Sequence, residues 1–188
     1  NQHIFVIGSG KASVVMAQAV SNVLGRKLSG GVVITNSLYN NNLPGNIKIL
    51  TSTHPIPSKE SVRAANYLTD FIKSIPKNSV VLNLVSGGTS SILCKPSSSI
   101  PFDDFIKLYQ ILLNSGIGIH EMNLIRKSVS EIKAGRLLQH FNDHQLCDLI
   151  ISDVPNDEIM DIGSGPTIPQ SFHFSDVISF LKNKKLWK

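Results

Sequence analysis

Short runs of β-branched and other apolar residues alternate with stretches of helical periodicity along this chain of 188 residues. Such alternation predicts βα units, in which neighbouring strands are parallel and helices cover both faces of the sheet. We therefore expect an α/β fold with a Rossmann-like sheet, wholly parallel or mixed, in a three-layer sandwich. The expected strands are 3–8, 30–35, 47–52, 79–85 and 146–152, and the expected helices are 11–25, a helix opened by Ser58, 102–116, 120–135 and 174–181.

Two of the expected strands end in turns rich in glycine. The first turn, Gly8-Ser9-Gly10, is followed by Lys11, and the second, Ser86-Gly87-Gly88, is followed by Thr89 and Ser90. In a parallel sheet both turns lie at the same edge, together with the loop that begins at Asp153. Glycines let backbone amides approach a ligand closely, and lysine adds a mobile positive charge. These turns therefore predict an anion site in which amides and hydroxyls cradle a phosphate.

Two familiar nucleotide motifs fit the first turn poorly. The phosphate loop G-x-x-x-x-G-K-[ST] fails because Gly8 and Gly10 are too close together and Ala12 replaces the hydroxyl residue. The dinucleotide fingerprint has Ser13 at its last position, and no acid ends the second strand. A tight turn with a solvated lysine remains the alternative for this motif alone.

Candidate donors and carboxylates follow later in the chain. On a helix over 120–135, Asn123, Arg126, Lys127 and Ser130 share one face, with Lys133 nearby, either as an exposed polar stripe or as donors to an anionic substrate. The loop from 153 adds Asp153 and Asp157, which are turn formers or ligands for Mg²⁺ beside a phosphate.

Composition narrows the function classes. The net charge of +5 comes from scattered basic residues, apart from Lys182, Lys184, Lys185 and Lys188, so we expect an anionic small substrate and no nucleic acid. Cys94 and Cys147 have no metal or redox spacing, and no apolar run is long enough to span a membrane. We expect a cytoplasmic protein that does not contact membranes.

Six motifs occur in an order that identifies a family: "GSGKAS", "THPIPSKES", "LVSGGTSSIL", "MNLIRKSVSEIKAGRL", "LIISDVPND" and "IGSGPTIP". From about Phe5 to Pro169 the chain resembles the N-terminal domain of the type-2 glycerate kinases, whose second half is called the MOFRL domain. The resemblance implies a two-domain enzyme that transfers the γ-phosphoryl group of ATP to D-glycerate, usually to the 2-hydroxyl, with Mg²⁺ or another divalent metal.

The resemblance also implies site residues. Lys11 matches the lysine thought to act in catalysis, and Asp153 and Asp157 become candidate metal ligands. The candidate substrate- or nucleotide-binding residues are Gly8, Ser9, Gly10, Ser86, Gly87, Gly88, Thr89, Ser90, Asn123, Arg126, Lys127, Lys133, Ser164, Gly165, Pro166 and Thr167. Family members usually have glycine where Thr89 and Ala134 stand, and aspartate where Gln170 stands.

The resemblance accounts for residues 1–188 as one domain. A helix that normally precedes the first strand and the C-terminal MOFRL domain would lie outside this sequence, and the chain alone is expected to be inactive. The missing domain is then a partner in the site, and a homodimer is compatible with the pattern. Two alternatives stay open: an inactive anion-binding fragment, and a hydroxypyruvate reductase, a name that some family members carry.

Overall fold

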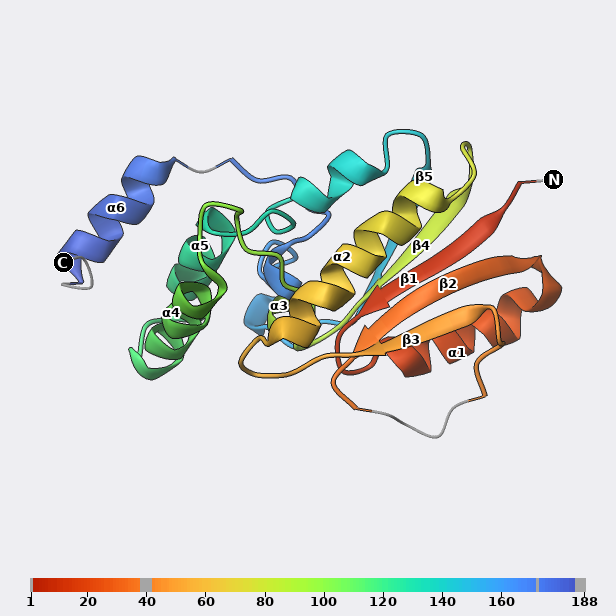
Figure 1. The fold of residues 1–188 in the computed structure, drawn as a ribbon, viewed down its shortest axis with the longest axis horizontal. Helices are drawn as coiled ribbons and strands as arrows, with labels where there is room; N and C mark the ends of the chain where they lie inside the picture. The colour runs from red at the N-terminus through yellow and green to blue at the C-terminus, as the bar shows by residue number, and fades with distance from the viewer. Residues whose placement is uncertain (1, 38–41, 172, 185–188) are drawn as a thin grey trace.

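The computed structural model describes residues 2–37, 42–171 and 173–184. A five-stranded sheet runs through it in the order β3-β2-β1-β4-β5, and every neighbouring pair is parallel (Figure 1). The strands are β1 (Ile4–Ser9), β2 (Leu28–Thr35), β3 (Ile47–Thr51), β4 (Val80–Val85) and β5 (Gln145–Ile150). The expected Rossmann-like α/β fold is confirmed, and the sheet is wholly parallel. Parts of the loop 36–46 and of the basic C-terminal end lie outside the described residues.

The strand order places a ligand site. The chain adds β2 and β3 on one side of β1 and then crosses over to form β4 on the other side. Strand order therefore reverses between β1 and β4, and open parallel sheets bind ligands at the carboxyl ends of strands at such a switch point. Both glycine turns begin at this point.

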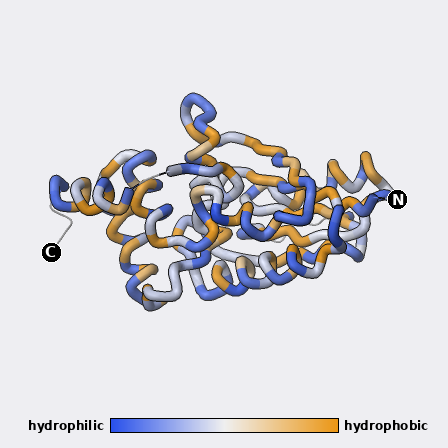
Figure 2. Tube along the Cα trace, turned by 90° about the horizontal axis from the view of Figure 1, so that it is seen from above, coloured by the Kyte–Doolittle hydropathy of each residue, from blue (hydrophilic) through white to orange (hydrophobic). Residues whose placement is uncertain are grey.

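One helix covers each face of the sheet, as expected for three layers. Helix α1 (Ser13–Leu24) packs Val14 and Ala17 onto one face, and helix α2 (Lys59–Ser74) packs Leu68 and Ile72 onto the other. Figure 2 shows hydrophobic and hydrophilic residues alternating along the helical turns. Each helix buries its apolar stripe, which is the main source of its stability in a protein.

A second group of helices lies beyond the carboxyl ends of the strands (Figure 1). It contains α3 (Thr89–Ile92), α4 (Phe102–Asn114), α5 (Ile119–Ser128) and α6 (Phe174–Asn183). Leu112 of α4, Ile125 of α5 and Val177 of α6 share one apolar cluster. Short 3₁₀ turns occupy Gly25–Lys27, Arg136–His140, Pro155–Asp157 and Ile162–Ser164. Within this group, Met122 and Arg126 of α5 lie near Gly88 of the second glycine turn.

The helix expected over 120–135 is wrong in its second half, because α5 ends at Ser128. Beyond that residue the chain pairs with the segment after α3: Ser97 N donates to Val129 O at 2.9 Å, and Glu131 N donates to Lys95 O at 2.9 Å. Ser130 is therefore not on the helix face of Asn123. The guanidinium of Arg136 donates to Lys127 O in the last turn of α5 and to Ser130 O just beyond it.

Ala134 in this irregular stretch has a φ of 55°, in the left-handed region. That conformation costs a residue with a side chain about 1–2 kcal/mol, whereas glycine loses only about 0.5–1 kcal/mol more chain entropy on folding. We expect Ala134→Gly to raise the free energy of unfolding by up to about 1 kcal/mol, measured by chemical denaturation. Ala19→Gly, on the exposed side of α1, is the matched control and should lower it by about 1 kcal/mol. Equal losses in both variants would contradict the strain at Ala134.

Candidate active site at the β1–β4 switch point

The two glycine turns contact each other directly. Lys11 N donates to Gly87 O at 2.9 Å, and Ala12 N donates to Ser86 Oγ at 3.0 Å. Gly10 has a φ of 118°, and a Cβ there would overlap Ser86. Glycine is therefore required where the first turn passes the second, and the contact brings Lys11 beside the turn that follows β4.

The second turn offers unused donors. The amides of Gly87 and Gly88 donate to no acceptor within the described residues. A Cβ on Gly87 would overlap the carboxylate of Asp153, and one on Gly88 would lie 3.0 Å from His54 Cδ2 and 3.3 Å from Lys11 Cε. The free amides of Gly87 and Gly88, the side chain of Lys11 and the carboxylate of Asp153 thus surround one small space, which we call the cradle.

The pKa of His54, which lies beside Gly88, depends on the charges around this cradle. Burial lowers its pKa below the ordinary value, and the positive charges of Lys11 and Arg126 lower it further, while Asp153 acts in the opposite direction. Lys11, Arg126 and Asp153, which lie on three different segments of the chain, thus all lie near His54.

A pocket of about 460 Å³ opens beside the cradle. Three of its lining residues, Ser90, Arg126 and Asp153, are polar or charged candidates from the sequence, and they lie on three different segments. The lining includes His54, Gly88, Ser90, Ser91, Arg126 and Asp153 on the polar side, and Leu113, Ile119, Met122, Val154 and Pro155 on the apolar side.

Arg126 is the most unusual of these residues. It is only 6 % exposed, and its guanidinium lies 4.9 Å from the centre of the Tyr109 ring. Its Nε is buried without a hydrogen-bond partner, and no carboxylate within the described ranges pairs with it. Burial lowers the pKa of Arg126, but arginine stays charged in proteins. A buried cation that lacks a counter-ion and lines a pocket is suited to bind an anion.

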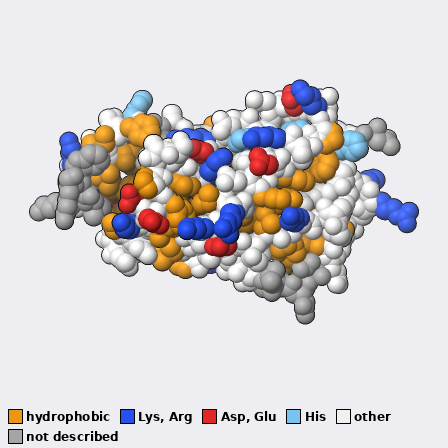
Figure 3. Space-filling view, viewed as in Figure 1, with side chains coloured by type: hydrophobic (Ala, Val, Ile, Leu, Met, Phe, Trp, Pro, Cys, Tyr) orange, Lys and Arg blue, Asp and Glu red, His pale blue; other side chains and the backbone are white. Residues whose placement is uncertain are grey.

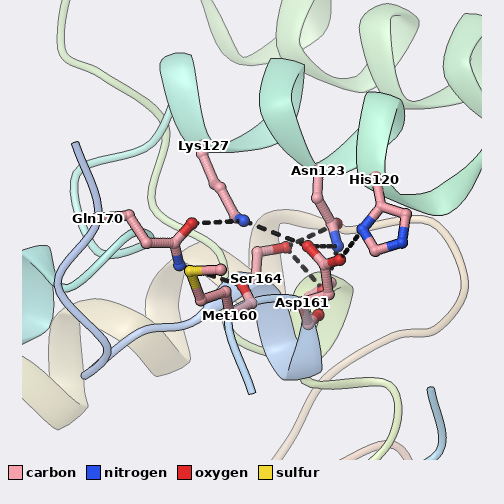
Figure 4. Close-up of polar contacts among 8 residues, drawn as sticks. His120, Asn123, Lys127, Met160, Asp161, Ser164 and Gln170 are labelled. Carbon is pink, nitrogen blue, oxygen red and sulfur yellow. Dashed lines mark hydrogen bonds and ion pairs between the residues drawn. The ribbon is translucent and has the colours of Figure 1, made fainter. Parts of the chain in front are cut away.

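Asn123 and Lys127 do not line this pocket, although Asp161 does. Both donate to the carboxylate of Asp161, at 3.0 and 3.2 Å, and His120 also contacts it (Figure 4). Lys127 donates further to Gln170 Oε1 at 2.7 Å. Burial acts to raise the pKa of Asp161, but these hydrogen bonds and positive charges outweigh it and hold the pKa below the ordinary value. The sequence analysis did not identify Asp161 as the residue that Asn123, Lys127 and His120 contact, because the sequence shows it only as one of several acids in the same loop.

Other candidates from the sequence support the fold of the site. The Thr89 hydroxyl is buried and lies 2.8 Å from both Ser9 O and Ser86 O, which share its single proton. Ser164 is fully buried, and the Thr167 hydroxyl donates to Asp148 at 2.8 Å. The Pro166 carbonyl accepts from Leu137 N, and the Gly165 carbonyl from Gly135 N. These residues tie the turns and the last loop together rather than face the pocket.

The two aspartates expected at a metal site are placed differently. Asp153 lines the pocket, and its carboxylate has no hydrogen-bond or ion-pair partner among the described residues, whereas Asp157 is exposed and does not line it. Within those residues no three His, Cys, Asp or Glu side chains gather as a metal site. The arrangement fits Mg²⁺ held by one carboxylate together with oxygens of a bound phosphate.

Lys133 is buried, and its amine donates to Ser90 O at 2.8 Å and lies 3.5 Å from Leu93 O. Burial lowers its pKa from 10.5 to about 8. Between pH 8 and 10.5 the unfolded chain therefore binds a proton that the folded chain does not, so stability rises with pH in this window. Relative to Lys133→Met, the wild-type chain should gain up to about 3 kcal/mol across it, measured by denaturation at each pH.

The control for this prediction is Lys107→Met, which changes an exposed lysine of α4. Its stability curve should run parallel to the wild-type curve. Parallel curves for Lys133→Met as well would show that the buried amine keeps its ordinary pKa.

Basic and acidic side chains are interspersed on the face drawn in Figure 3. Among the helices described, none has the length and apolar character needed to cross a bilayer.

Comparisons with known proteins agree with this architecture. Over 98% of its length the chain is 34% identical to the "Glycerate 2-kinase" of Pyrococcus horikoshii, of which it covers 41%. It is 37% identical over 96% of its length to a "Putative hydroxypyruvate reductase" of Agrobacterium vitis, of which it covers 47%. The crystal structure of a glycerate kinase from Thermotoga maritima matches all of the chain with a TM-score of 0.90 at 30% identity, across 45% of that protein.

The chain thus spans less than half the length of these relatives. A family model described as a domain of unknown function, DUF4147, matches residues 1–188. The parallel sheet, the paired glycine turns and these matches together show that the chain belongs to the DUF4147 domain family and resembles glycerate kinases over its whole length.

Proposed function

We propose that the protein containing this chain transfers a phosphoryl group from ATP to D-glycerate, giving 2-phosphoglycerate. The observation that carries the proposal is Arg126, a buried guanidinium without a counter-ion, which lines the same pocket as Gly88 and Asp153. Phosphoryl transfer requires positioning and charge neutralisation more than covalent chemistry, and this pocket offers both. The relatives named as glycerate kinases supply the substrate class.

Each charged group has a place in the proposed mechanism. Arg126 binds the glycerate carboxylate through its planar fork of N–H donors. The free amides of Gly87 and Gly88 hold anionic oxygens of the nucleotide, and Lys11 offsets charge on the transferring group. Asp153 would hold Mg²⁺, which neutralises the phosphate oxygens when it is bound.

We further propose that the longer relatives reflect a second domain, and that it completes the cleft over this pocket. The ATP-binding face would then be shared between both domains, in a protein of the cytoplasm, and the 188-residue chain alone would bind anions without turnover. The proposal leaves room for a homodimer. It is supported by the short coverage of the relatives and by the exposed apolar residues Leu113 and Ile119 at the pocket.

A coupled assay of ADP release by the natural full-length protein, with Mg²⁺, ATP and D-glycerate, tests the proposal. Release of ADP that depends on glycerate is the expected result, and NMR of the product identifies the phosphorylated hydroxyl. NADH-dependent reduction of hydroxypyruvate without ADP release would replace the kinase with the reductase named among the relatives.

A further inference from the structure

A buried chain of hydrogen bonds runs from Asp161 through Asn123 and Ser164 to Ser90, and both of its end residues line the pocket. Its first member is the Asp161 carboxylate, which only accepts hydrogen bonds when ionised. Asn123 is fully buried, and its Nδ2 donates to Asp161 Oδ1 at 3.0 Å (Figure 4). The opposite amide orientation would place two oxygens together, so the carboxylate fixes Asn123 with its Oδ1 pointing away from Asp161.

The orientation of the Asn123 amide determines the direction of the next hydrogen bond, to Ser164. Asn123 Oδ1 can only accept, and Ser164 Oγ donates to it at 3.0 Å. A serine hydroxyl has a single proton, which Ser164 uses in this bond. The remaining contact of Ser164 Oγ, with Ser90 Oγ at 2.9 Å, must therefore have Ser90 as the donor.

This order leaves Ser90 with lone pairs and no free proton. Ser90 is half-buried and lines the pocket in the first turn of α3, two residues after Gly88. Phosphate and carboxylate oxygens also only accept hydrogen bonds, so Ser90 has nothing to donate to them. The predicted role of Ser90 as a donor to phosphate therefore conflicts with the direction of this chain.

We propose that Ser90 accepts a hydrogen bond from a hydroxyl group of the bound substrate, and that Asp161, Asn123 and Ser164 are positioning residues that impose this polarity. The inference rests on the proposed function and deepens it. Arg126 recognises the carboxylate, and Ser90 recognises a hydroxyl beside it, so the pocket selects hydroxy acids over simple carboxylic acids.

Calorimetric titration of the natural full-length protein tests this selectivity with four ligands. They are D-glycerate, D-lactate, which lacks the 3-hydroxyl, 3-hydroxypropionate, which lacks the 2-hydroxyl, and propionate, which lacks both. A neutral hydrogen bond contributes about 1 kcal/mol, so the wild-type protein should prefer glycerate to one of the monohydroxy acids by at least about fivefold. Ser90→Ala should abolish that preference and leave propionate binding unchanged.

Two further variants test the direction of the hydrogen bond between Ser90 and Ser164. Ser164→Ala keeps the Ser90 hydroxyl but frees its proton, so the same preference should shrink although Ser90 is present. Ser99→Ala changes an exposed serine in the loop after α3, outside the pocket lining, and should behave as wild type.

The other outcomes are decisive as well. Equal weakening of all four ligands by Ser90→Ala would mean that Ser90 donates to the carboxylate, which overturns the inference. An unchanged preference in Ser90→Ala or in Ser164→Ala overturns it too. Binding of glycerate with unaltered selectivity would leave the proposed function standing, whereas no binding of any of the four acids would remove both.

Discussion

Replacing Lys11 with alanine in the natural full-length protein is expected to lower kcat for glycerate phosphorylation by about 10²- to 10³-fold. The lysine is exposed, and its backbone is held by the bond from its amide to Gly87 O at 2.9 Å, which alanine keeps. Its side chain passes beside Gly88, where the free amides of the second turn face the cradle. Removing the charge therefore takes away a stabilising interaction with the transferring group and leaves the turn in place.

The measurement is steady-state ADP release together with a thermal melt. Lys73→Ala, which removes an exposed lysine at the end of α2, is the control and should keep wild-type kcat. The melting temperature of Lys11→Ala should equal that of wild type, because exposed substitutions rarely change stability by more than about 0.5 kcal/mol. Unchanged kcat in Lys11→Ala would remove this residue from the mechanism.

The fold could be predicted because local signals and topology agree. The strand Val80–Val85 is apolar except for Asn83, as expected of a strand buried on both faces. Ser58 caps α2 by accepting from Glu60 N at 3.2 Å, as its place before the apolar pattern indicates. Alternation of these strands with helices leaves few arrangements besides a parallel sheet.

The end of α5 could not be predicted from periodicity. Val129 and Ile132 continue the apolar spacing of Ile125, which satisfies a helical pattern. In the fold, Ile132 joins the core between the sheet and α2, while Ile125 joins the cluster of α4 and α6. The two halves of the segment 120–135 thus pack into separate cores, and hydrogen bonds with the segment 95–97 replace helical ones.

The site was predictable in its glycine turns and less so in its donors. Gly10, Gly87 and Gly88 have conformations or contacts that exclude a side chain, so their residue type carries the information. Asn123 and Lys127 lie on the predicted face of α5, but spacing does not reveal which acid meets that face. Asp161 lies more than thirty residues later and is brought there only by the fold.

Replacing Arg126 with methionine should have opposite effects on stability and activity. Burying a cation without a counter-ion or full hydrogen bonding costs several kcal/mol, and stacking on Tyr109 offsets about 0.5–2 kcal/mol of this. Arg126 bears this cost, because it is only 6 % exposed and its Nε has no hydrogen-bond partner. Methionine has a similar length and can pack on the ring, so the free energy of unfolding should rise by about 1 kcal/mol or more.

The same variant should lower kcat/KM for glycerate by at least about 10²-fold, because the charge-assisted bonds to the substrate carboxylate are lost. Arg126→Lys is the control: it keeps the positive charge but lacks the planar fork, so its activity should fall between those of wild type and Arg126→Met. Denaturation curves and ADP release measured on the same preparations separate the two effects. A loss of stability in Arg126→Met that matches its loss of activity would show that the guanidinium holds the fold together, and that it is not reserved for an anionic ligand.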